Sequence, residues 1–172
     1  MQELKSVYSK EELLNNAVEL LKKLIEIPSF SKDEFNTSVE IENFFKKYQI
    51  PTKRFKNNIW AVNKNFDVFK PSILLNTHHD TVKPNKAYTL DPFLPIEKDG
   101  KLFGLGSNDA GASLVSMAQV FLHFFDKENL KYNLIIALTA EEEISGFGGI
   151  EALFLQLPNI ELRVQVGWSV SR

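Results

Sequence analysis

The sequence has 172 residues, of which 44% are hydrophobic and 24% charged, so it predicts a globular domain with a core of its own. A formal net charge of −2, no apolar signal segment and no stretch of membrane-spanning length favour a cytoplasmic protein that binds neither nucleic acid nor a membrane. Since the sequence contains no cysteine, disulfide bonds and thiolate ligands are excluded, and any metal must be bound by His, Asp or Glu.

Apolar periodicity and proline positions predict two helices and two strands in the first half of the chain. In chain order these are a helix that begins near Ser9 and ends at Pro28, a helix over 33–48, a short strand over 54–63 and a strand over 72–76. The last of these, SILLN, is a compact apolar run that is typical of a buried parallel strand.

The second half alternates in the same way. We expect a loop over 81–104 with a short strand at 101–103, an apolar helix after Asp109, a buried strand over 133–138, a helix over 149–157 and a strand over 162–166. Strands that alternate with helices predict an α/β layered sheet. Active sites of such sheets lie at the carboxyl ends of the strands, so the residues after SILLN and NLIIAL are the first candidates.

Polar residues follow the first buried strand directly, as Thr77-His78-His79-Asp80. Side chains alternate along an extended chain, so His78 and Asp80 share a face and His79 points the other way. His78 can then offer one ring nitrogen to a metal while Asp80 accepts a hydrogen bond from the other. Taken alone, the motif also fits a polar strand end with a surface pair of histidines.

The second buried strand leads into three carboxylates, Glu141, Glu142 and Glu143. One of them could bind a metal while its neighbour acts as a general base toward water. Taken alone, the motif also fits an acidic cluster near a helix N-terminus.

A glycine-rich segment, GLGSNDAG over 104–111, precedes the apolar helix. It would place Asp109 at the helix start, where the two oxygens of one carboxylate can bridge two cations. The segment also fits a turn in which Asn108 or Asp109 caps the helix. It matches neither a phosphate-binding loop nor the dinucleotide-binding glycine pattern.

Together and in this order, the three motifs resemble the dizinc metallopeptidase and deacylase family of acetylornithine deacetylase, succinyl-diaminopimelate desuccinylase, carboxypeptidase G and aminoacylase-1. The resemblance covers residues 11–160 and is closest to the acetylornithine deacetylase-like branch, through THHDTVKP, DPF at 91–93 and GLGSNDAG. It implies a three-layer α/β/α catalytic domain with a mixed, mostly parallel sheet. It also implies hydrolysis of an amide bond in an N-acyl amino acid, such as N-acetylornithine in arginine biosynthesis, or in a short peptide.

The resemblance further implies two Zn²⁺ ions, for which Co²⁺ or Mn²⁺ could substitute. His78 would bind one ion, Glu143 the other, and Asp109 both. Asp80 would orient His78. Glu142 would be the general base that later passes its proton to the leaving amine.

Two finer features follow from the same resemblance. It implies a cis peptide bond between Asp109 and Ala110. The sequence departs from the family pattern at two positions: Lys83 interrupts the usual Val-Pro, and Glu141 stands where Asp is more usual.

The family places a further metal-binding carboxylate after the next strand and a last His near the C-terminus, whereas here Gln165 and Val166 lead to GWSVSR. We therefore expect residues 1–172 to form the N-terminal part of the catalytic domain, without its C-terminal part and without the domain for dimerisation or closure. The full-length relative could be a homodimer. With Asp109 shared, each zinc would have two protein ligands where catalytic zinc has about three, so we expect weak metal binding and little activity. A dizinc aminopeptidase or dipeptidase, and a non-catalytic truncated remnant, remain as alternatives.

Overall fold

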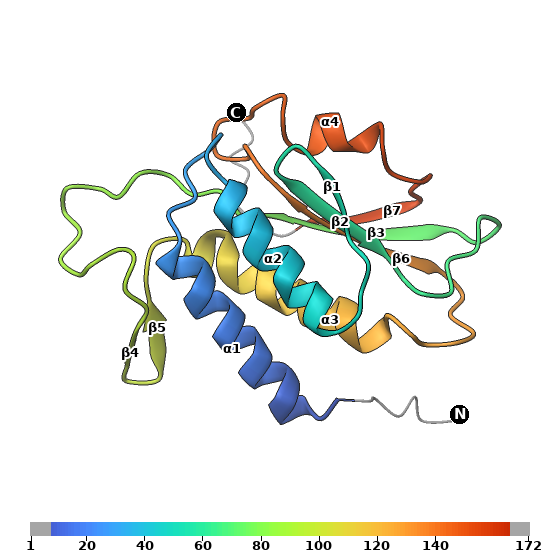
Figure 1. Ribbon diagram of the computed structural model, residues 1–172, viewed down its shortest axis with the longest axis horizontal. Helices are drawn as coiled ribbons and strands as arrows, with labels where there is room; N and C mark the ends of the chain where they lie inside the picture. The colour runs from blue at the N-terminus through green and yellow to red at the C-terminus, as the bar shows by residue number, and fades with distance from the viewer. Residues whose placement is uncertain (1–7, 166–172) are drawn as a thin grey trace.

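The chain folds into a central sheet with helices on both faces (Figure 1). The computed structural model describes residues 8–165. In chain order its elements are α1 (Lys10–Glu26), α2 (Phe35–Lys47), β1 (Lys53–Phe55), β2 (Asn58–Val62), β3 (Ser72–His78), β4 (Ile96–Lys98), β5 (Lys101–Phe103), a π-helical turn η1 (Ser107–Ala112), α3 (Ser113–Phe124), β6 (Asn133–Thr139), α4 (Ile150–Phe154) and β7 (Leu162–Gln165).

The sheet is mixed and has the strand order β1-β2-β6-β3-β7. β3 pairs in parallel with β6 and β7, whereas β2 pairs antiparallel with β1 and β6, so β2 runs opposite to the other four strands. His78 at the end of β3 is in register with Thr139 at the end of β6. The residues that follow these two strands therefore meet at one edge of the sheet.

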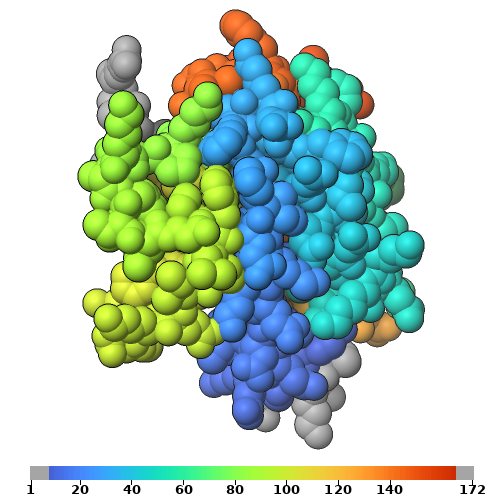
Figure 2. Space-filling model, turned by 60° about the vertical axis from the view of Figure 1, so that its left-hand side comes forward, coloured from blue at the N-terminus to red at the C-terminus, as the bar shows by residue number. Residues whose placement is uncertain are grey.

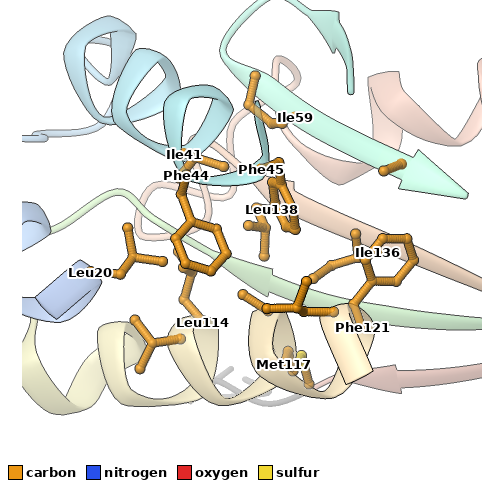
Figure 3. Packing of buried hydrophobic residues seen from close by; sticks show 14 of the residues in the cluster. Leu20, Ile41, Phe44, Phe45, Ile59, Leu114, Met117, Phe121, Ile136 and Leu138 are labelled. Atoms are coloured by element: carbon orange, nitrogen blue, oxygen red, sulfur yellow. The ribbon is translucent and has the colours of Figure 1, made fainter. Parts of the chain in front are cut away.

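The two strongly apolar strands contribute side chains to a core on each face of the sheet. On one face Leu75, Ile136 and Leu138 join the cluster formed with α1, α2 and α3, whose close packing Figure 3 shows. On the other face Leu74 and Ile135 join a smaller cluster, which includes Leu153 of α4. Burial on both faces explains why these strands read as continuous apolar runs, and it confirms the prediction of a layered α/β fold.

The helix boundaries follow local sequence signals. Oγ of Ser9 accepts a hydrogen bond from the backbone N–H of Glu12, and Oε2 of Glu12 accepts one from the N–H of Ser9, which forms a capping box. α1 ends two residues before Pro28, close to the predicted end. On the surface, α1 lies between α2 and the segment that contains β4 and β5 (Figure 2). No helix within residues 8–165 has both the length and the apolar character needed to cross a membrane.

The prediction of one strand over 54–63 is wrong, because a tight turn divides it. β1 and β2 form an antiparallel hairpin in which Phe55 pairs with Asn58. Lys56 adopts a left-handed conformation with φ of 53°. The polar residues at the turn carry the signal that alternation alone did not show.

The segment 81–104 contains one strand more than predicted. β4 pairs with β5 through Asp99 and Gly100, which have φ values of 52° and 71°. An Asp-Gly pair with both φ values positive is a strong hairpin signal. Near the C-terminus, α4 is shorter than the predicted 149–157, and β7 covers the predicted strand at 162–166 as far as Gln165. The predictions for Val166 and for the tail GWSVSR fall outside the described residues.

Candidate metal centre

Three segments that are far apart in the sequence meet at the carboxyl edge of the sheet. His78 ends β3, Asp109 lies in η1, and Glu143 follows β6. Each offers one ligand atom, and these atoms all lie within 4.8 Å of one another. The Nε2 atom of His78 is 3.2 Å from Oδ1 of Asp109. The structure thus brings together the imidazole and the two carboxylates that were predicted to bind metal.

The glycine-rich segment shapes the approach of Asp109. Gly106 has a φ of 71°, and its carbonyl accepts a hydrogen bond of 2.8 Å from the N–H of Gly111. Between them Asp109 and Ala110 depart from helical φ and ψ values, and the peptide bond that joins them is cis, as the resemblance implied. Asp109 therefore lies in an irregular turn before α3, where its side chain is 45% exposed and faces His78.

Asp80 is fully buried and contacts both sides of the centre. Its Oδ1 lies 3.3 Å from Nδ1 of His78. Its carboxylate also accepts hydrogen bonds from the hydroxyl of Ser31 at 2.7 Å and from the backbone N–H groups of Glu142 and Glu143, each at 3.1 Å. Burial alone would raise the pKa of Asp80, but the hydrogen bonds from His78, Ser31 and the Glu143 N–H outweigh it and lower that pKa. Asp80 is therefore an anion that can hold a proton on Nδ1 of His78.

His78 is surrounded by negative charge. Burial lowers its pKa, but the hydrogen bond and charge of Asp80, together with Glu142 and Asp109, raise it to about 9. Its Nε2 faces Asp109 and lies 3.7 Å from Oε2 of Glu142. A proton or a divalent cation at Nε2 would satisfy these carboxylates, so the two compete for the same nitrogen.

Glu142 and Glu143 have raised pKa values. In both cases burial is the largest cause, and the nearby carboxylates of Asp80 and Asp109 add to it, while His78 acts in the opposite direction. A carboxyl group whose pKa is raised holds a proton more readily than an ordinary glutamate, which suits it to take up and release one.

His79 points away from the centre, as strand alternation predicted. Its Nδ1 lies 2.9 Å from Oγ1 of Thr37, and its Nε2 lies 3.0 Å from the carbonyl of Asn57. Burial lowers the pKa of His79 to about 4, so the ring is neutral at pH 7. A neutral ring whose Nε2–H donates to the Asn57 carbonyl accepts from Thr37 at Nδ1.

Two glutamates have roles that the motifs did not reveal. Glu141 has a φ of 57°, and its carboxylate turns away from the centre to accept a hydrogen bond from the N–H of Gly148. Its own N–H donates to Glu34, a carboxylate that is 0% exposed. In the sequence, Glu34 looks like an acidic residue at a helix start, and no local signal distinguishes it.

Similar proteins share this sequence pattern over most of the chain. Succinyl-diaminopimelate desuccinylase of Sulfurovum sp. (strain NBC37-1) is 26% identical over 149 residues, which are 86% of this chain and 39% of that protein. The enzyme of the same name from Buchnera aphidicola subsp. Acyrthosiphon pisum (strain Tuc7) is 34% identical over 137 residues, which are 76% of this chain and 36% of that protein. The chain thus spans well under half the length of these curated relatives.

Solved structures share the fold. Human carnosine dipeptidase 1 gives a TM-score of 0.71 at 16% identity, over 89% of this chain and 38% of that chain. The YXEP protein of Bacillus subtilis, described as a dinuclear metal binding peptidase from the M20 family, gives 0.70 at 18% identity, over 94% of this chain and 45% of that chain. The predicted peptidase-like catalytic fold is therefore confirmed. Residues 74–166, more than half of the chain, match the family model for peptidase family M20/M25/M40, and this protein belongs to that family.

Proposed function

We propose that this chain is the metal-binding part of a hydrolase that cleaves the amide bond of an N-acyl amino acid. The observation that carries the proposal is the convergence of His78, Asp109 and Glu143, whose ligand atoms lie within 4.8 Å of one another. Imidazole nitrogen and carboxylate oxygen form a donor set that suits Zn²⁺, and also Co²⁺ or Mn²⁺. The chemistry of the residues present therefore fits the metals that the family resemblance implies.

In this proposal the three ligands divide between two ions. His78 and Asp109 would hold one, and Asp109 and Glu143 the other. A bound divalent ion supplies Lewis-acid chemistry, which draws electron density from an amide carbonyl and makes water a better nucleophile. Asp80 keeps a proton on Nδ1 of His78, so that Nε2 presents its lone pair to the centre.

Glu142 moves the proton in this reaction. Its carboxylate takes a proton from the attacking water as the hydroxyl group adds to the carbonyl carbon. When the C–N bond breaks, the same proton passes to the leaving nitrogen, which gives an amine and a carboxylic acid. The raised pKa of Glu142 and its place 3.7 Å from Nε2 of His78 support this role.

The substrate class rests on the sequence relatives and on the motifs. A cavity of about 190 Å³ lies beside the centre and is lined by His78, Glu142, Ser145 and Gly146, among others. Relatives named succinyl-diaminopimelate desuccinylase support an N-acyl amino acid, and the motifs favour N-acetylornithine within that class. Because the chain matches less than half of these relatives, we propose that residues 1–172 correspond to the N-terminal part of their catalytic domain.

One test addresses the metal centre. We expect the purified chain to bind zinc, measured by elemental analysis after equilibrium dialysis against a buffer that contains zinc, and Asp109→Asn to lose it. Asp33→Asn makes the same chemical change at an exposed position and should retain zinc. The absence of zinc, cobalt and manganese from all three proteins would contradict the proposal and favour a non-catalytic remnant.

A second test addresses the substrate. Cobalt absorption reports the oxygen ligands of a bound substrate, so the cobalt-loaded chain is titrated with N-acetylornithine, N-succinyl-diaminopimelate and an alanine dipeptide. Release of free amine is followed in the same samples with and without a chelator. We expect the two N-acyl amino acids to change the spectrum and the dipeptide to leave it unchanged. A response to the dipeptide alone would overturn the deacylase proposal in favour of a dipeptidase.

A further inference from the structure

Glu34 is a buried carboxylate that lies behind the metal centre. Its side chain is 0% exposed and comes directly before α2. It accepts hydrogen bonds from the N–H of Lys32 at 2.6 Å, from Nδ2 of Asn57 at 2.8 Å and from the N–H of Glu141 at 3.1 Å. All three donors are neutral amide groups. Burial of a carboxylate is expensive, and several N–H donors can stabilise it through charge-assisted hydrogen bonds.

The third donor places Glu34 in contact with the acidic segment of the centre. The N–H of Glu141 donates to Glu34, and the next two N–H groups, of Glu142 and Glu143, donate to Asp80. Three successive backbone N–H groups thus donate hydrogen bonds to two buried carboxylates, Glu34 and Asp80. Glu141 has a φ of 57°, a left-handed conformation that is unfavourable for a residue with a side chain. The hydrogen bond to Glu34 is therefore made at the residue with this unfavourable backbone conformation.

Asn57 ties Glu34 to the rest of the fold. While its side chain donates to Glu34, its carbonyl accepts from Nε2 of His79 at 3.0 Å and from the hydroxyl of Ser38 at 2.7 Å. Through Asn57, the carboxylate of Glu34 is therefore linked to Ser38 of α2 and to His79, the residue beside His78.

We infer that Glu34 is a positioning residue, which fixes the backbone of Glu141 so that the side chains of Glu142 and Glu143 face His78. The inference rests on the proposed function in one respect, because the positioned groups are the proposed base and ligand. It differs from a purely structural role in one measurable consequence. Removal of Glu34 should loosen residues 141–143 and weaken metal binding beyond what general destabilisation produces.

The first experiment needs no metal. Hydrogen exchange is measured on the metal-free wild-type chain, on Glu34→Ala and on the matched control Asn133→Ala. Asn133 is 1% exposed and makes hydrogen bonds to Asp67, Lys70 and Ser72, but it lies at the opposite end of β6. We expect amides 141–143 to exchange about tenfold faster in Glu34→Ala and to be unchanged in the control.

The second experiment separates the hydrogen bond from the charge. Glu34→Gln keeps an oxygen that can accept from the N–H groups of Lys32 and Glu141, and its NH₂ group can donate to Asn57 once the Asn57 amide rotates to present its oxygen. Glu34→Asp keeps the charge but withdraws it by one methylene group. Dissociation constants for Co²⁺ and Zn²⁺ are measured by titration calorimetry. We expect the affinity of Glu34→Gln to stay within about threefold of wild type, and that of Glu34→Asp and Glu34→Ala to fall about tenfold or more.

Each outcome decides a point. Equal exchange and equal affinity in Glu34→Ala and Asn133→Ala would overturn the inference. If Glu34→Asp retains its affinity for Co²⁺ and Zn²⁺ while Glu34→Gln loses it, the inference is overturned, because the negative charge of Glu34 and not its hydrogen bond would then support metal binding. If Glu34→Ala does not fold, the metal affinities of Glu34→Gln and Glu34→Asp still test the inference, because it predicts a loss in Glu34→Asp alone. Faster exchange in Glu34→Ala without metal binding by the wild type would uphold the positioning role and refute the proposed function.

Discussion

Oδ2 of Asp80 accepts a hydrogen bond of 3.1 Å from the backbone N–H of Glu143, a residue 63 positions further along the chain. Oδ1 of the same carboxylate lies 3.3 Å from Nδ1 of His78. One buried side chain therefore contacts the imidazole on one side of the proposed metal centre and the acidic segment on the other. Four predictions follow from this geometry and from the packing around it.

Asp80→Asn should weaken both metal binding and folding. The amide is isosteric, but its NH₂ group would face either His78 Nδ1–H or one of the two backbone N–H donors, so at least one contact becomes repulsive. We expect a loss of about 10–100-fold in Zn²⁺ affinity, as for other partners of metal-binding histidines, and a lower Tm. Titration calorimetry and thermal unfolding measure the two effects. Asp33→Asn serves as the exposed control, and an unchanged zinc affinity in Asp80→Asn would rule out the orienting role.

Glu142→Gln and Glu143→Gln should have different effects, although the residues are adjacent. Glu143 belongs to the group of potential ligands, so its amide should reduce bound Zn²⁺ by about tenfold or more. Glu142→Gln should retain Zn²⁺ and lose any chelator-sensitive amide hydrolysis, because Gln cannot accept the proton. Zinc content and amine release are measured on the same preparations. If Glu142→Gln loses Zn²⁺ and Glu143→Gln retains it, then Glu142 is the ligand and Glu143 the base.

Stability in the presence of a chelator should fall as the pH drops from about 6.5 toward 4, because His79 is buried in its neutral form. Its pKa is about 4 in the folded chain against an ordinary 6.5. Between these values the unfolded chain binds a proton that the folded chain does not, so the stabilising contribution is present above pH 6.5 and is lost as the pH falls through 4. The full loss corresponds to about 3 kcal/mol.

Urea unfolding of the wild type and of His79→Gln at pH 7, 5.5 and 4.5 isolates this contribution. Other groups titrate in both proteins, so the difference between their two pH dependences belongs to His79. We expect the wild type to lose more stability than the variant on acidification. Parallel curves would mean that His79 is protonated in the folded chain.

Gly111→Ala should disturb η1 and, through it, Asp109. A Cβ at this position would lie 2.5 Å from the carbonyl oxygen of Gly106 and 2.6 Å from Cδ1 of Leu21, and the backbone cannot yield as a side chain can. We expect destabilisation of about 1–3 kcal/mol and weaker zinc binding. Gly100→Ala is the control: its Cβ meets no atom within 4 Å, so the cost of about 1 kcal/mol comes from its φ of 71° and should leave zinc affinity unchanged. Equal zinc affinity in both variants would contradict the proposed link to Asp109.

Local signals in the sequence predicted most of the helices and strands, and the family resemblance of the three motifs picked out the three residues that converge. Ser9 and Glu12 form their capping box within one turn, and SILLN and NLIIAL are apolar because both faces of the sheet are covered. These features depend on neighbours within a few residues, so they can be predicted from the sequence. The turn at Lys56 and the Asp-Gly hairpin are also encoded locally, but by turn chemistry, which neither strand alternation nor loop composition reveals.

Only the tertiary structure decided which buried groups hold the acidic segment. Glu34 and Glu141 are 107 positions apart, and their hydrogen bond exists because β6 pairs with β2 and β3 and so carries residue 141 to the start of α2. No feature within a few residues of Glu34 distinguishes it from an exposed acidic residue at a helix start. Its burial and its hydrogen-bond donors result from strand order and helix packing. These depend on many contacts between residues that are far apart in the sequence, so no local pattern reveals them.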